Sequence, residues 1–291
     1  MRKKTPLVIF IFFIFFQTSA QQAVRVDTVV YKVIDTVSLK MDVIYPFSIQ
    51  KNKKYPCIVF FYGGGWEGRN YDQFRRQANH FAGEGFICFL ADYRTKLKQG
   101  TTPFESLKDA KSAIRFIRAN ASKFHINKDS LIGSGGSAGG HLAAATALVD
   151  GYNESGDDLS VSCIPNALVL FNPVIDNGPG GYGFERIGEQ YKSFSPLHNI
   201  RKGAPPTIIF LGTKDHLIPE ETMKYYQLVM EKVGSHCDLV LYKEQDHGFF
   251  NKKEYVEKTL AETDRFLTSL GYFGKHNYSK LDSPGTIKLS D

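Results

Sequence analysis

The chain has 291 residues, of which 42% are hydrophobic and 23% are charged, values that are ordinary for a globular protein with a sizeable core. They exclude a fibrous and an intrinsically disordered chain. The formal net charge is +6, and it falls to +3 if residues 1–20, which contain Arg2, Lys3, Lys4 and no acid, are removed. A surplus this small does not indicate a nucleic-acid-binding protein.

The first twenty residues have the layout of a secretory signal peptide. Three basic residues precede an unbroken apolar run over residues 7–16, and small residues follow up to Ala20. A membrane-spanning helix needs ~20 apolar residues, about twice the length of this run. We therefore expect cleavage after Ala20, a secreted or periplasmic protein, and no stable membrane insertion of the mature chain. An uncleaved anchor is the alternative.

Strand-like and helical segments alternate after the signal. Residues 24–45 alternate apolar with polar side chains, which predicts an antiparallel hairpin at a sheet edge with one face in water. From Cys57 onward the strand-like segments are continuously apolar, as strands buried on both faces are. Helices are predicted over residues 102–122, 137–149, 219–233 and 256–270. The alternation predicts a mostly parallel central sheet of about eight strands with helices on both faces.

A single domain is expected, because no linker rich in Pro, Gly or Ser divides the chain. It is predicted to cover residues 21–271, with a polar tail over residues 272–291. A glycine- and aromatic-rich excursion over residues 176–200 lies between two predicted strands. The cysteines are predicted to be buried free thiols, with one disulfide bridge as the open alternative. They are Cys57, Cys88, Cys163 and Cys237, and their spacing does not match a zinc site.

Residues 130–149 contain two overlapping glycine motifs. Residues 133–138 read GSGGSA and match the dinucleotide motif G-x-G-x-x-A. Residues 135–139 read GGSAG and match G-x-S-x-G, which holds a serine on a sharp strand-to-helix turn. A dinucleotide site needs its turn in the first strand–helix unit and an acid at the end of the next strand. Four or five predicted strands precede this turn, and Asp157 and Asp158 come before the next strand. The segment therefore predicts a nucleophile, Ser137.

A nucleophilic serine needs a base that takes its proton and a carboxylate that orients the base. On a parallel sheet these groups come from loops at the carboxyl ends of strands, in the chain order serine, acid, histidine. Asp215 follows the apolar segment TIIFLG, and His247 follows the segment CDLVLY. We therefore predict that Ser137, Asp215 and His247 form a catalytic triad.

Other residues near these positions are weaker candidates. His216 is adjacent to the predicted acid and would point elsewhere along the backbone. His141 lies one helical turn after the serine, in a direction that leads into the helix packing, so a structural hydrogen bond is its expected role. Asp246 precedes the predicted base directly, and a direct neighbour rarely reaches around to the histidine ring.

Acyl transfer also needs hydrogen-bond donors for the oxyanion that develops on the substrate. The amide of Ala138, which follows the nucleophile, is one donor. The segment YGGGW after the strand beginning at Cys57 is expected to supply more, because consecutive glycines let backbone N–H groups approach a substrate oxygen. We predict an oxyanion hole formed by Gly63, Gly64 and Ala138.

Taken together, these motifs resemble the α/β-hydrolase superfamily, and within it the esterases related to hormone-sensitive lipase and to bacterial carbohydrate esterases. The resemblance rests on YGGGW, ADYR, GGSAGG, GTKDHLIP and DHGFF, and it extends over about residues 24–270. It implies an α/β-hydrolase fold and a serine carboxylesterase that needs no metal or organic cofactor. Tyr62 departs from the family, whose oxyanion loop usually begins with a histidine that braces the loop. Gly136 replaces an acidic residue of many relatives, and the large N-terminal cap of the family is expected to be missing.

The expected substrate is a small-molecule or polysaccharide ester with a short acyl group. No long apolar cap segment is available to bind a fatty chain, which favours acetyl esters. Export and the aromatic excursion favour polysaccharides such as acetylated xylan, with a feruloyl esterase or an exported serine peptidase of the same fold as alternatives. The candidate substrate contacts, for which packing is the alternative role, are Tyr62, Trp66, Tyr182 and Phe184.

Overall fold

The computed structural model describes residues 24–273 and 287–290. The predicted signal peptide, with its cleavage site after Ala20, lies outside the described residues. The strands are β1 (Val26–Ile34), β2 (Val37–Ile44), β3 (Tyr55–Phe61), β4 (Ile87–Ala91), β5 (Ile126–Gly136), β6 (Ala167–Phe171), β7 (Thr207–Gly212), β8 (Cys237–Tyr242) and β9 (Ile287–Ser290). The helices are α1 (Arg75–Gly83), α2 (Lys96–Gln99), α3 (Pro103–Ala119), α4 (Ala138–Leu148), α5 (Phe184–Ile187), α6 (Tyr191–Phe194), α7 (Glu220–Lys232) and α8 (Lys253–Ser269).

One twisted sheet runs through the molecule with the strand order β1-β2-β4-β3-β5-β6-β7-β8-β9. The β1–β2 and β2–β4 pairs are antiparallel, and the pairs from β4 to β9 are parallel. The predicted edge hairpin and the mostly parallel sheet are therefore confirmed. The described part contains nine strands rather than about eight, because β9 lies within the segment predicted as a polar tail. This strand is only four residues long, too short for a periodic pattern to reveal it.

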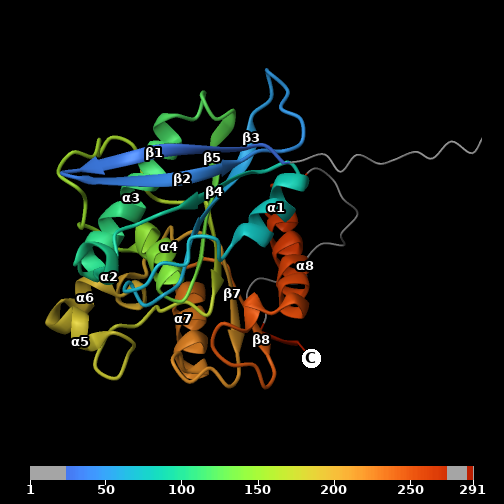
Figure 1. Ribbon diagram of the computed structural model, residues 1–291. Helices are drawn as coiled ribbons and strands as arrows, with labels where there is room; N and C mark the ends of the chain where they lie inside the picture. The colour runs from blue at the N-terminus through green and yellow to red at the C-terminus, as the bar shows by residue number, and fades with distance from the viewer. Residues whose placement is uncertain (1–23, 274–286, 291) are drawn as a thin grey trace, which may run out of the picture.

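Helices cover both faces of the sheet, as predicted (Figure 1). The helices α3, α4 and α7 pack on one face, where Leu142 and Tyr226 are fully buried. The helices α1 and α8 pack on the other face, where Phe81 and Phe266 are buried. Burial of a leucine or phenylalanine side chain contributes roughly 1.5–3 kcal/mol. This two-sided core makes the carboxyl ends of the parallel strands a rigid platform.

Local sequence determines where the helices begin. Thr102 and Glu105 form a capping box, so α3 begins at Pro103 and ends at Ala119, three residues before the end of the predicted range 102–122. Pro219 occupies the N-cap position of α7 and does not lie in its first turn.

Among the described residues, no helix combines the length and the apolarity that a membrane span needs. All four cysteines are buried free thiols, in agreement with the prediction.

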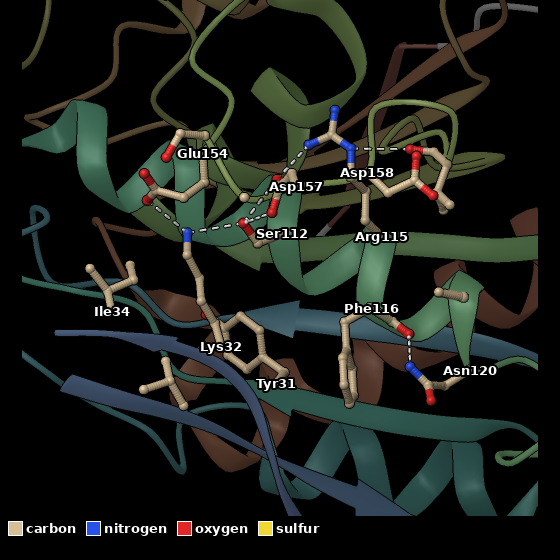
Figure 2. Close-up of a pocket in the computed structure, with 15 residues that line it drawn as sticks. Tyr31, Lys32, Ile34, Ser112, Arg115, Phe116, Asn120, Glu154, Asp157 and Asp158 are labelled. Carbon is tan, nitrogen blue, oxygen red and sulfur yellow. Dashed lines mark hydrogen bonds and ion pairs between the residues drawn. The ribbon is translucent and has the colours of Figure 1, made fainter. Parts of the chain in front are cut away.

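Ion pairs attach the N-terminal hairpin to the rest of the domain (Figure 2). The Nζ of Lys32 in β1 lies 2.7 Å from Oδ1 of Asp109 in α3 and 3.1 Å from Oε2 of Glu154. It also donates to Oγ of Ser112 at 2.9 Å. Arg94 binds the same two carboxylates, at 2.8 and 2.9 Å. The carboxylate of Asp109 is fully buried, so its two cations are needed to compensate its lost hydration.

Candidate active site

Ser137 lies on the sharp turn between β5 and α4. Its φ of 53° is in the left-handed region, which costs a residue with a side chain roughly 1–3 kcal/mol. Hydrogen bonds hold this conformation: its amide donates to Phe171 O at 2.9 Å, and its carbonyl accepts from the amide of Val174 at 3.1 Å. A Cβ at Gly139 would lie 2.1 Å from Phe61 O. The turn therefore packs directly on the end of β3, and only glycine fits there.

The structure brings the three predicted triad residues together. Nε2 of His247, after β8, lies 2.9 Å from Oγ of Ser137, and Nδ1 lies 2.8 Å from Oδ2 of Asp215, after β7. The carboxylate of Asp215 is fully buried, and its Oδ1 accepts the backbone amides of residues 217 and 218 at 2.9 and 3.0 Å. A carboxylate can only accept, so Nδ1 carries the proton and Nε2 is free to accept the proton of the serine hydroxyl.

The alternative residues make other contacts. Burial lowers the pKa of His141 to about 3, so this histidine is neutral. Its Nε2 lies 3.2 Å from Phe194 O, which is a structural contact. Nδ1 of His216 lies 2.8 Å from Oδ1 of Asp246 at the surface, and Asp246 also accepts the backbone amide of His247. The His216–Asp246 pair thus connects the two loops that carry the acid and the base.

The glycine loop after β3 lines a cavity of about 300 Å³ together with Ser137 and His247. The amide of Gly63 donates to Oε1 of Gln73 at 2.6 Å, so this predicted oxyanion donor already has a partner. The amides of Gly64, Gly65 and Ala138 make no hydrogen bond within the described part of the chain. Of the three predicted oxyanion donors, Gly64 and Ala138 therefore have free amides, and the amide of Gly65, which was not among them, is free as well.

Tyr62 is buried, is not among the residues that line the cavity beside Ser137, and braces the glycine loop. Its hydroxyl donates to Oδ1 of Asp92 at 2.8 Å, and the same carboxylate binds Nε of Arg69 at 3.0 Å. The ring of Tyr93 stacks on the ring of Tyr62 at 4.2 Å, and the Tyr93 hydroxyl donates to Tyr62 O at 2.7 Å. A tyrosine and an aspartate thus provide here the brace that the resemblance assigns to a histidine.

The other predicted substrate contacts lie at different depths. Trp66 is 1% exposed, and its ring packs edge-on against His141 at 5.1 Å, so it belongs to the core. Tyr182 lines the cavity beside the nucleophile and also a second cavity of about 230 Å³ that adjoins it. Phe184 packs against Tyr191 at 6.0 Å and is not among the residues that line either cavity. Of the four predicted contacts, Tyr182 is the one that lines the cavity beside Ser137.

Two residues that the sequence analysis missed complete the site. Asn172, at the end of β6, is fully buried with a φ of 34°. Its Nδ2 lies 3.4 Å from Nε2 of His247, and its Oδ1 accepts the amide of Gly248 at 3.1 Å. Asparagine tolerates left-handed backbone better than most residues, and its place directly after an apolar strand was a usable signal. Gln73, the partner of the Gly63 amide, carries no comparable signal.

No cluster of His, Cys, Asp or Glu with metal-binding geometry occurs among the described residues.

Most of the known proteins that this chain resembles are named as esterases. The family model described as BD-FAE matches residues 41–177, and the model of the dienelactone hydrolase family matches residues 180–277. An acetylxylan esterase of Xylanibacter ruminicola is 27% identical over 241 residues, which are 76% of this chain and 47% of that protein. The esterase LipC of Mycobacterium tuberculosis is 26% identical over 194 residues, 60% of this chain and 48% of that protein. The chain spans about half the length of these curated relatives.

Solved structures give a closer correspondence. The esterase 2 of Thermogutta terrifontis is 38% identical, with a TM-score of 0.83, and the match covers 86% of this chain and 97% of that chain. Further structures of the same esterase contain bound propionate and bound butyrate.

Proposed function

This chain belongs to the esterases of the α/β-hydrolase superfamily, and on that basis we propose that it is an exported serine carboxylesterase that hydrolyses short-chain acyl esters, acetyl esters of polysaccharides above all. The observation that carries the proposal is the contact of His247 with both Ser137 and Asp215, at 2.9 and 2.8 Å. The free backbone amides of Gly64, Gly65 and Ala138 lie in the glycine loop and at the start of α4.

Each group has a defined role in the proposed reaction. Ser137 attacks the ester carbonyl while Nε2 of His247 takes the hydroxyl proton, and Asp215 stabilises the imidazolium that forms. The amides of Gly64, Gly65 and Ala138 stabilise the negative charge on the carbonyl oxygen. His247 then protonates the leaving alcohol, and water repeats both steps on the acyl-enzyme to release the acid and restore the serine.

The size of the site supports a small acyl group. The cavity beside the nucleophile has a volume of about 300 Å³, at the lower limit of ligand pockets. Tyr182 and Leu217 line both this cavity and an adjoining one, and we propose that the adjoining cavity takes the alcohol part of the ester. The binding of propionate and butyrate by the Thermogutta esterase agrees with a short acyl group. The acetylxylan esterase among the relatives supports acetylated xylan as the first substrate to test.

The function is tested with a panel of esters and one amide. We expect the hydrolysis of p-nitrophenyl acetate and butyrate, a decline for p-nitrophenyl decanoate, and acetate release from acetylated xylan. Methyl ferulate and an aminoacyl nitroanilide test the feruloyl esterase and peptidase alternatives. Ser137→Ala should lose the activity, whereas the matched control Ser130→Ala should keep it. Full activity of Ser137→Ala on p-nitrophenyl acetate would refute the proposed mechanism.

Export is tested separately from catalysis. The basic and apolar start of the chain supports it, so the protein expressed from its full-length gene should be recovered outside the cytoplasm with an N-terminus at Gln21. Recovery of the uncleaved chain in the cytoplasm would contradict this part of the proposal and leave the esterase reaction untouched.

A further inference from the structure

The excursion over residues 176–200, between β6 and β7, contains no triad residue but contacts the glycine loop. Arg186, in the short helix α5, donates from Nη1 to Gly65 O at 2.6 Å. The two residues are 121 positions apart in the sequence. In Figure 1, α5 and α6 lie together at one end of the molecule, beyond the helices that cover the sheet. This charge-assisted hydrogen bond joins the excursion to the loop that carries two of the three free amides.

Packing holds the Arg186 side chain in a single place. Its guanidinium lies 5.4 Å from the ring centroid of Trp66 and 5.1 Å from that of Tyr182. The side chain is 18% exposed, and its Nε pairs with Glu185 at 2.9 Å. A Cβ at Gly65 would lie 2.8 Å from the Tyr182 hydroxyl, so the excursion lies directly against the loop. A stacked, planar and permanently charged group suits a fixed contact better than a lysine would.

The three glycines are each held by a different partner. The Gly63 amide is held by Gln73, and the Gly64 carbonyl accepts the amides of Glu67 and Gly68 at 3.0 Å within the turn. The Gly65 carbonyl has Arg186 as its partner from outside the loop. The Gly65 carbonyl belongs to the peptide that joins Gly65 to Trp66, so the Arg186 bond fixes that peptide. Gly65 has a φ of 63°, and glycine tolerates many other conformations, so the orientation of the preceding peptide, which carries the Gly65 amide, depends on this anchor.

We propose that Arg186 is a positioning residue that anchors the Gly65–Trp66 peptide and thereby keeps the preceding amides of Gly64 and Gly65 oriented toward the oxyanion. The inference rests on the proposed function. Because Arg186 acts through the loop and does not touch the substrate, its loss should weaken the binding of the transition state and leave the binding of the ground-state ester nearly unchanged.

The test compares Arg186→Met with the control Lys192→Met, which removes a cation that lies over the Tyr191 ring in the same excursion. We expect kcat for p-nitrophenyl acetate to fall about 10- to 100-fold in Arg186→Met, less than the loss of a whole oxyanion donor, with KM within about twofold. Affinity for a trifluoromethyl ketone, whose serine adduct carries an oxyanion, should fall by the same factor. Arg186→Lys should recover part of the loss, and the control should match the parent enzyme.

The outcomes separate this inference from the proposed function. A parent protein without activity on any ester would refute the proposed function and this inference with it. An active parent whose Arg186→Met variant retains kcat and trifluoromethyl ketone affinity would overturn the inference alone. So would an equal loss in the control variant. Rates are normalised to the fraction labelled by a fluorophosphonate, so that unfolded protein does not count as lost catalysis. If Arg186→Met does not fold, Arg186→Gln, which keeps a donor without the charge, is measured in the same way.

Discussion

Gly139→Ala should separate the nucleophile from the oxyanion loop. A methyl group at this position would lie 2.1 Å from Phe61 O and 2.3 Å from Tyr62 O, whereas such contacts are ordinarily no shorter than 3.0 Å. Both atoms are backbone carbonyls at the end of β3, so they cannot rotate away. The start of α4 and the end of β3 must therefore move apart by about 1 Å, because the Cβ contact is that much too short.

The structure sets the size of the expected effects. Forcing an extra methyl group into a packed core costs about 1–3 kcal/mol, which lowers the melting temperature by roughly 2–12 °C in a domain of this size. The same displacement changes the distance between Ser137 and the amides of Gly64 and Gly65. A misplacement of about 1 Å between catalytic groups and substrate lowers the rate about 100-fold. We expect kcat/KM to fall by about that factor even at a temperature at which the variant is fully folded.

The assay pairs thermal unfolding with p-nitrophenyl acetate kinetics. The matched control is Gly156→Ala, where a Cβ would meet nothing within 4 Å. The control should keep both the melting temperature and kcat/KM of the parent. If Gly139→Ala behaved like this control, the close packing of α4 on β3 would not be what positions the oxyanion loop.

Three further changes probe the acid, the brace and a helix contact. Asp215→Asn should lower kcat about 10⁴-fold, because an amide NH₂ favours the wrong tautomer of the histidine ring, and a loss below about tenfold would contradict the role of this acid. Tyr62→Phe should reduce the free energy of unfolding in urea by about 1–2 kcal/mol, because it leaves the buried Asp92 carboxylate one hydrogen-bond donor short. An unchanged urea midpoint would refute the role of Tyr62 as a brace of the glycine loop. His80 donates a hydrogen bond to the Asp264 carboxylate, which raises the pKa of His80. This contact between α1 and α8 is therefore fully stabilising below the unfolded pKa of about 6.5 and weakens as pH rises through the folded value. The unfolding free energies of parent and His80→Ala should thus differ more at pH 5.5 than at pH 9, and an equal difference would contradict this.

The sequence predicted the triad because the fold leaves few places for it. Ser137, Asp215 and His247 each follow an apolar strand, and parallel strands carry their following loops to the same edge of a sheet. Both Asp215 and Asp246 fit the chain order, and the direct adjacency of Asp246 to His247 is what counted against it; the structure places Asp246 on His216. Strand ends can be located from hydrophobic runs alone, so long-range geometry was predictable at these three positions.

The oxyanion loop was less predictable, because the free amides depend on side chains far away in the sequence. Gln73 occupies the amide of Gly63, and Arg186 binds the carbonyl of Gly65. Neither residue lies in a motif, and both act through one polar atom whose direction depends on tertiary packing. Tyr62 was likewise hard to place from the sequence. It was a candidate substrate contact, whereas its hydroxyl donates to the buried Asp92 carboxylate and its ring lies in the core.

The strained backbone around the cavity explains why the site depends on such distant contacts. Ser137, Asn172 and Trp66 have φ values of 53°, 34° and 59°, and left-handed backbone is unfavourable for each of them. The end of β6 joins the first two, because Phe171 O accepts the amide of Ser137 at 2.9 Å and the amide of Asn172 donates to Phe210 O at 2.7 Å. Asn172 in turn holds the loop of His247 through the Gly248 amide. Nucleophile and base therefore share one support on the sheet, whereas the oxyanion loop is held from the side by Gln73 and Arg186. A change at Arg186 should accordingly impair oxyanion stabilisation while the serine–histidine contact stays intact.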